Sequence, residues 1–135
     1  MSGSFVFVEQ EPFGSAAARD RAKAAFVVQL VAMVTDVPAT EITRATRAQG
    51  SAARARGLAM YLLNVALSMP LMRVAAAFGR DRTTVGQAVS RMEDLRSEPA
   101  FDEALRALER CARAAPLQLS SRALGIDRRV LEDDR

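Results

Sequence analysis

Apolar residues recur at helical spacing along most of the chain, and this pattern limits the choice of fold more than any other feature. Within residues 76–94, the apolar residues Val85, Ala88, Val89 and Met92 occupy positions i, i+3, i+4 and i+7. Such spacing predicts an amphipathic helix with one face on the core. Alanine and leucine are used heavily, and β-branched residues do not dominate. Both observations favour helices, so the sequence predicts an all-α fold.

Prolines and glycines divide the periodic pattern into about six helical segments. Pro38, Pro70 and Pro99 end one segment or open the next, and Gly79 closes a short one. A chain of 135 residues corresponds to one domain, since domains usually contain ~100–200 residues. We expect a flexible lead at residues 1–14, a domain at 15–115 and a mobile tail at 116–135. The predicted helices cover about residues 16–36, 38–43, 51–68 and 70–79, then the stretch up to Pro99 and the stretch that begins there.

Each long segment has a stripe of apolar residues that we expect to face the core. Arg56, Gly57 and Asn64 are expected on a different face of the third segment, away from its stripe. Cys111 lies on the last stripe and is expected to fill the core. The stripes consist of Ala24, Val27, Val28, Val31 and Val34, then Leu58, Tyr61, Leu62, Val65 and Ala66, and finally Phe101, Leu105, Leu108 and Cys111.

The residue types that are missing make an enzyme improbable. Histidine, the commonest general base and metal ligand, does not occur, and one cysteine cannot form an internal disulfide. The sequence contains no GxxxxGK[ST] phosphate loop, and no apolar run reaches ~18 residues. We therefore expect no enzymatic activity, cofactor, metal, small-molecule substrate or membrane span. The expected location is the cytoplasm, in association with the nucleoid.

Positive charge is concentrated in the middle of the chain. The net charge is +3, but the segment from Arg44 to Arg96 contains nine arginines and three acids. The remaining segments, taken together, are slightly acidic. A basic segment of this kind is typical of a nucleic-acid surface. A GC-rich coding bias would give the same composition, so charge alone leaves that alternative open.

A short helix, a tight turn at Gly79 and a helix that opens with polar residues together predict a helix-turn-helix. In this motif the first turn of the second helix enters the major groove of DNA. Arginine can bind guanine there, aspartate can accept from the cytosine amino group, and a threonine methyl can pack on the thymine methyl. The helix N-terminus also favours a phosphate. For Asp81 or Thr83 alone, a role as the N-cap of the helix remains open.

The stretch ARARGLAMYLLNVALSMPLMRVAAAFGRDRTTVGQAV resembles the C-terminal DNA-binding domain of the bacterial replication initiator DnaA. The family signature Phe-Gly-Gly-Arg-Asp-His-Thr-Thr-Val corresponds to FGRDRTTV, and FVVQLVAMVTDVPATEI resembles the first helices of that domain. The resemblance covers about residues 22–112. It implies a Trp-repressor-like fold of the DnaA C-terminal type. Because the phosphate loop is missing and the chain is short, we expect no ATPase domain like that of DnaA. The chain is also similar to stand-alone DnaA-domain-like proteins of alphaproteobacteria.

The resemblance implies roles for individual residues. The family's major-groove readers match Asp81, Thr83 and Thr84, and its base-contacting histidine falls on Arg82. Its minor-groove arginine falls at or next to Arg47, and a phosphate-contacting arginine matches Arg56. We expect base readout from Arg80, Asp81, Arg82, Thr83 and Gln87, and phosphate or minor-groove contacts from Arg44, Arg47, Arg54, Arg56, Leu71, Met72, Thr84 and Arg91.

The chain departs from the family at several of these positions. The glutamine after the phosphate-contacting arginine is Gly57, a lysine is Asn64, and one glycine of the Gly-Gly pair is missing, which leaves Gly79. Arginine instead of histidine at Arg82 shifts the expected contact toward guanine or a phosphate. These departures leave the recognised sequence open.

Two functions remain open at this point. In the first, the protein binds double-stranded DNA, including DnaA-box-like sites, and modulates replication initiation or transcription. In the second, it binds DnaA or another replication protein without sequence-specific DNA binding. Gly57 and Asn64 favour the second function slightly, whereas the cluster from Arg80 to Thr84 favours the first.

Overall fold

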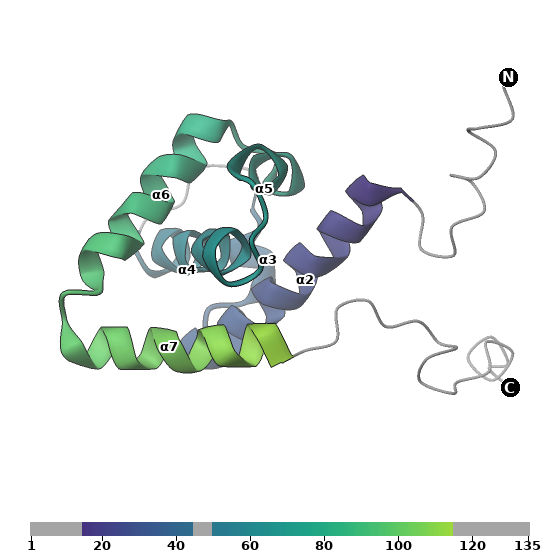
Figure 1. Cartoon of the computed structure of the whole chain (residues 1–135). Helices are drawn as coiled ribbons and strands as arrows, with labels where there is room; N and C mark the ends of the chain where they lie inside the picture. Colours follow the sequence, from purple (N-terminus) through teal and green to yellow (C-terminus); the bar gives the residue numbers. More distant parts are fainter. Residues whose placement is uncertain (1–14, 45–49, 115–135) are drawn as a thin grey trace, which may run out of the picture.

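The protein is described by a computed structural model that covers residues 15–44 and 50–114; the predicted lead, the tail from residue 116 and Arg47 lie outside the described residues. Every regular element in this part is helical (Figure 1). The predicted all-α fold with about six helices is confirmed, because η2 continues α4 without a break. The elements are α2 (Ala16–Thr35), α3 (Ala39–Ile42), α4 (Ser51–Tyr61), the π-helical turn η2 (Leu62–Ala66), α5 (Leu71–Phe78), α6 (Arg82–Leu95) and α7 (Pro99–Ala114).

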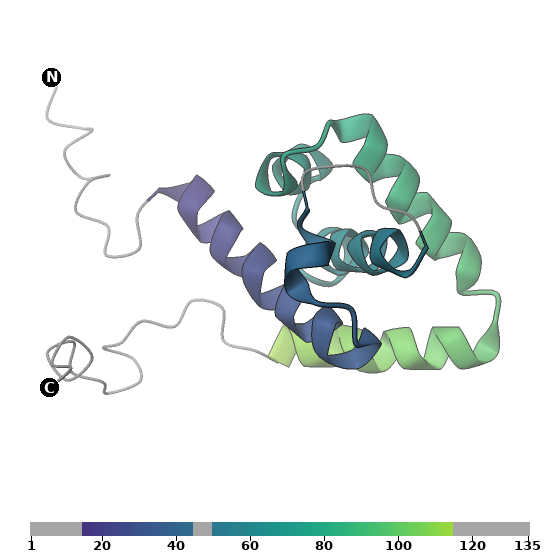
Figure 2. The same ribbon diagram turned by 180° about the vertical axis from the view of Figure 1, so that it is seen from behind.

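Helix α4 lies at the centre of the fold. It contacts α2, α3 and α6, while α5 bridges α2 and α6 and α7 packs against η2 (Figure 1). Seen from behind, α3 lies over α2 and α4 (Figure 2). Because neighbours surround α4, every residue from Ala55 to Leu63 is buried. Arg56 and Gly57, which the sequence places on a different face from the apolar stripe, are therefore buried as well.

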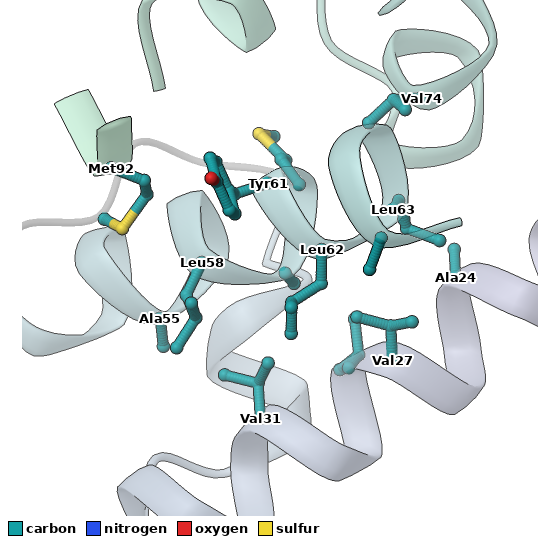
Figure 3. Packing of buried hydrophobic residues seen from close by; sticks show 14 of the residues in the cluster. Ala24, Val27, Val31, Ala55, Leu58, Tyr61, Leu62, Leu63, Val74 and Met92 are labelled. Carbon is teal, nitrogen blue, oxygen red and sulfur yellow. The ribbon is translucent and has the colours of Figure 1, made fainter. Parts of the chain in front are cut away.

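At the centre of the core, side chains from α2 lie against side chains from α4 and η2 (Figure 3). Val27, Val31, Tyr61 and Leu62 are completely buried, as their stripes predict. Burying each such side chain contributes about 1.5–3 kcal/mol to the free energy of folding. In this part of the core, the helical spacing predicts the buried residues correctly.

Two of the predicted core positions are wrong. Val34 is 53% exposed, because Val37 and Ile42 fill the core beyond the end of α2. Cys111 is exposed as well. On α7 the buried line passes through Leu105 and Ala112, and Cys111 lies beside this line.

The third predicted helix does not continue regularly to residue 68. At η2 the Leu67 N–H donates to the Leu62 carbonyl at 3.1 Å, five residues back, which widens the helix into a π-turn. The Asn64 side-chain amide then donates to the Met69 carbonyl at 2.9 Å, and Ser68 takes a positive φ of 57°. These contacts turn the chain toward Pro70 and α5. Asn64, where the family has lysine, therefore has a structural contact.

An arginine-centred network holds α6, α7 and α4 together. The Arg96 guanidinium, just after α6, donates to Asp102 at 2.6 Å, to Glu109 at 2.7 Å and to the Tyr61 hydroxyl at 2.8 Å. The hydrogen bond from Arg96 keeps the pKa of Asp102 below its ordinary value. Burial raises the pKa of the Tyr61 hydroxyl. Arg96 thus belongs to the fold, although it counts toward the basic segment.

A second ion pair joins α2 to α5. Arg73 donates to Asp20 through two hydrogen bonds of 2.8 and 2.9 Å, and the Asp20 side chain is only 10% exposed. The bidentate geometry lowers the pKa of Asp20, chiefly through hydrogen bonding from Arg73. Arg73 is therefore also a residue of the fold.

Candidate nucleic-acid interface

The turn before α6 depends on one glycine. Helix α5 ends at Phe78, and Gly79 follows with φ 67°, in the left-handed region that glycine tolerates best. The Arg80 N–H then donates to the Ala75 carbonyl at 2.9 Å, and the Gly79 N–H to the Ala76 carbonyl at 3.3 Å. This double closure is a Schellman motif. It reverses the chain within two residues and brings the start of α6 next to the end of α5.

The first turn of α6 is capped by Asp81. Its Oδ1 accepts a hydrogen bond of 2.7 Å from the Thr84 N–H, and hydrogen bonds from the Thr84 backbone and side chain lower the pKa of Asp81. The capping role that the sequence left open for Asp81 is therefore present. The side chains of Asp81, Arg82, Thr83 and Thr84 are exposed around this N-terminus.

Three exposed polar side chains of α6 are not used within the fold. Val85 and Met92 are buried against the core, whereas Arg82, Gln87 and Arg91 are exposed. No hydrogen bond or ion pair involves these three side chains within residues 15–44 and 50–114. Their donors are therefore available to a ligand.

A groove runs between α4 and α6. Its larger hollow has a volume of about 410 Å³, and a second hollow of about 260 Å³ adjoins it. Gly57 lines both hollows, and a Cβ added there would meet the Met92 Cε at 3.4 Å. The groove brings together five of the predicted contact residues in its larger hollow and Arg54 in its smaller one. The larger hollow is lined by Ala53, Arg56, Gly57, Met60, Arg80, Thr84, Gln87, Ala88 and Arg91.

Arg56 is the predicted contact residue with the least exposure. Only 8% of it is accessible, and burial, followed by the nearby charge of Arg80, lowers the pKa of its guanidinium. It donates from Nε to the Ile42 carbonyl at 2.7 Å, and from Nη2 to the carbonyls of Glu41 at 3.2 Å and Arg44 at 3.3 Å. The end of α3 is thus capped by a side chain that enters from α4.

Arg80, from the turn before α6, also donates to the Arg44 carbonyl. Its Nη2 donates to the Arg44 carbonyl at 2.6 Å, and its Nη1 donates to the Phe78 carbonyl at 3.4 Å. The Arg44 side chain itself is ion-paired with Glu41. Of the predicted arginines, Arg54, Arg82 and Arg91 are therefore the ones without a partner in the described part of the chain.

The remaining predicted contacts lie at the start of α5. Met72 is 69% exposed and Leu71 is half-buried, so only Met72 presents most of its side chain to solvent. Among the described residues, no group of three or more cysteines and carboxylates could hold a metal ion. No described helix is both long enough and apolar enough to cross a lipid bilayer.

Some residues of the site were missed from the sequence. Ala53, Met60 and Ala88 form apolar parts of the groove, and nothing in their residue types signals this. The internal use of Arg73 has a visible signal, because its partner Asp20 precedes the buried Ala24 and Val27 at helical spacing. An acid in line with an apolar stripe indicates a buried ion pair.

The comparisons with known proteins agree with this geometry. Residues 24–92, from Ala24 in α2 to Met92 in α6, match the family model for the bacterial DnaA protein helix-turn-helix. The chain belongs to this family. The match includes α5, the Gly79 turn and most of α6, and it confirms the fold that the signature FGRDRTTV implies.

A solved structure supports the same conclusion. The chain is similar to the crystal structure of a DNA replication initiation factor, with a TM-score of 0.65 and 28% sequence identity. The similarity covers 83% of this chain and 36% of that protein, so it concerns about a third of the initiation factor. A search of curated proteins gives no match. In this DnaA-type helix-turn-helix, α6 takes the place of the second helix of the motif.

Proposed function

We propose that this protein binds double-stranded DNA and reads a short site with the first turn of α6. One observation carries the proposal: the side chains of Arg82, Gln87 and Arg91 are exposed on α6 and have no partner among the described residues. Membership of the DnaA helix-turn-helix family supports the same function. An unpaired arginine on the second helix of such a motif is well placed for base or phosphate contacts.

The contacts divide by position along the helix. Arg82 lies in the first turn, where a guanidinium can donate two hydrogen bonds to guanine. Thr83 follows it and offers a methyl group and a hydroxyl to a base edge. Arg54 and Arg91 line the smaller hollow beside α6 and suit phosphates, which carry no sequence information. Arg82 thus governs sequence preference in this proposal, and Arg54 and Arg91 govern general affinity.

The proposed role is modulation of replication initiation or transcription by a nucleoid-associated cytoplasmic protein that acts as a stand-alone binder. DnaA-box-like sequences are the first candidate sites, because the family match includes the helix-turn-helix. The mechanism that we propose involves no nucleotide hydrolysis. Competition with DnaA for shared sites and assistance in its loading are the two simplest ways for such a protein to act.

A second candidate function is protein binding without sequence-specific DNA recognition. Asn64, where the family has lysine, donates its amide to the Met69 carbonyl instead of extending to solvent. Gly57, where the family has glutamine, has no side chain to reach a phosphate. Two family contacts are thus missing, and DnaA or another replication protein becomes the candidate partner.

Selection of bound sequences from random duplexes, followed by mapping of occupied sites in cells, tests the first function. Enrichment of one short motif is expected, and occupancy centred on origins or promoters separates replication from transcription. A salt titration accompanies the selection. Two to four phosphate contacts predict a slope of log K against log salt of roughly −2 to −4. If no motif is enriched and binding to DnaA is detected instead, the second function replaces the first.

A further inference from the structure

Two arginines from different elements donate to one backbone carbonyl near the start of α6. Arg56 on α4 and Arg80 in the turn before α6 both donate to the carbonyl of Arg44, over 3.3 and 2.6 Å. Arg56 also donates to the two preceding acceptors on α3, the carbonyls of Glu41 and Ile42. We call this arrangement the carbonyl clamp.

The chemistry of the end of a helix explains why two cations are accommodated side by side. The last carbonyls of α3 have no intrahelical partner, and they carry partial negative charge. This helix has only four residues, so few bonds of its own hold it in place. The clamp therefore supplies donors where α3 lacks them. The repulsion between the two guanidiniums is offset by the carbonyls that lie between them.

A direct phosphate contact by Arg56 would require it to leave this arrangement. Its side chain is buried, and Nε and Nη2 are already committed to three acceptors. Turning the guanidinium toward DNA would leave the Ile42 carbonyl without its donor, which is costly. The carbonyls of Glu41 and Arg44 would keep the Arg44 N–H at 3.4 Å and Arg80 at 2.6 Å, respectively. Arg54 and Arg91 are exposed and have no such commitments in the described part of the chain.

We propose that Arg56 is a positioning residue, which together with Arg80 fixes the C-terminal end of α3 against the turn that opens α6. Arg56 therefore acts on DNA binding through the backbone that it holds, and the phosphate contacts come from other arginines. The effect on DNA rests on the proposed function, whereas the clamp itself can be tested without DNA. Lysine does not replace Arg56, because one ammonium cannot reproduce the planar set of donors.

The DNA-free test is amide hydrogen exchange on the whole chain. In Arg56→Lys, the amides of Ile42, Thr43 and Arg44 at the end of α3 should exchange roughly tenfold faster or more, as expected for the loss of one or two hydrogen bonds. The matched control is Arg91→Lys, on an exposed arginine, and it should leave these amides unchanged. Unchanged exchange in Arg56→Lys would overturn the clamp, whether or not the protein binds DNA.

The DNA test compares salt dependence among variants that still show a native circular dichroism spectrum. Arg56→Lys and Arg56→Met should both weaken binding by a similar factor and leave the slope of log K against log salt unchanged. Arg91→Met should reduce the magnitude of that slope by about 0.9, as expected for one lost phosphate contact. A reduced slope in Arg56→Met, with near-normal affinity in Arg56→Lys, would show that Arg56 contacts phosphate and would refute the positioning role.

If Arg56→Met does not fold, Arg80→Met tests the other half of the clamp. Faster exchange of the Arg44 amide, with little change elsewhere, is then the supporting result. No change at Arg44 would contradict the clamp. If the wild-type protein binds no DNA but the exchange results follow the prediction, the clamp stands and the proposed DNA-binding function fails.

Discussion

Replacement of Arg96 by methionine should destabilise the protein more than any other single arginine substitution on α6 or at its end. Methionine keeps most of the aliphatic length and removes the guanidinium. The substitution abolishes the hydrogen bonds to Tyr61, Asp102 and Glu109. It also removes the cation–π contact in which the Arg96 Cζ lies 5.9 Å from the centroid of the Tyr61 ring.

The loss of stability in Arg96→Met depends on which contacts its three partners retain. Asp102 retains Arg106 at 3.2 Å, and the Tyr61 hydroxyl retains Glu93 at 3.3 Å. Glu109, whose side chain is 10% exposed, keeps no partner among the residues that the structure describes. Removing one member of a fully buried pair costs about 3–5 kcal/mol. The Arg96 side chain is 21% exposed, so we expect about 2–3 kcal/mol.

Urea denaturation followed by circular dichroism measures this cost as a shift in midpoint. For a domain of this size, the expected loss corresponds to a fall in Tm of roughly 8–20 °C. The double variant Arg96→Met with Glu109→Gln should recover part of the loss, since no carboxylate is left unpaired. Arg91→Met, on the exposed face of α6, is the control and should stay within about 0.5 kcal/mol of wild type. A loss below about 0.5 kcal/mol for Arg96→Met would refute the reasoning.

Three further predictions concern single residues. Gly57→Ala should raise the free energy of unfolding by about 0.5–1 kcal/mol in urea titrations, because alanine favours the helix. The added Cβ would meet only the flexible end of Met92 and the Ala88 methyl. A loss of stability would contradict this prediction. Asp81→Asn should keep the wild-type Tm because asparagine also caps helices, whereas Asp81→Ala should lower it; equal Tm values would show that the cap is unimportant. The pKa of Asp20 is lowered in the folded protein, so its ionised carboxylate stabilises the fold above the ordinary pKa of 3.8, and this stabilisation is lost as the pH falls through the lower folded pKa. In urea titrations from pH 5 to 2, Asp20→Asn should therefore lose less stability than wild type. Parallel stability curves for the two proteins would exclude this role.

The sequence predicted the helix-turn-helix well because its signals are local. Pro70 opens α5, Gly79 closes it, and the polar cluster that begins at Arg80 precedes α6 within a few residues. Each signal acts on the backbone next to it, so no knowledge of the tertiary fold is needed. The stripe of Val85 and Met92 was predicted for the same reason.

The roles of the arginines could not be predicted in this way. Arg73 pairs with Asp20 over 53 residues of chain, and Arg96 reaches Tyr61 over 35 residues. From composition alone, Arg73 and Arg96 belong to the basic segment, but in the structure both form contacts within the fold. The π-turn at η2 is equally non-local, since Arg113 Nε from α7 donates to the Ala66 carbonyl at 3.1 Å. Tertiary contacts decide these features, and spacing along the chain does not record them.

The most direct test of the account compares wild type and Arg82→Ala on the selected duplex and on a scrambled duplex of equal length, at fixed salt. Arg82 has no partner in the described residues, so its loss should leave the Tm nearly unchanged. We predict that affinity for the selected duplex falls by about 1–3 kcal/mol, while affinity for the scrambled duplex changes little. An equal loss on both duplexes, or no DNA binding by the wild-type protein at low salt, would contradict base recognition by the first turn of α6.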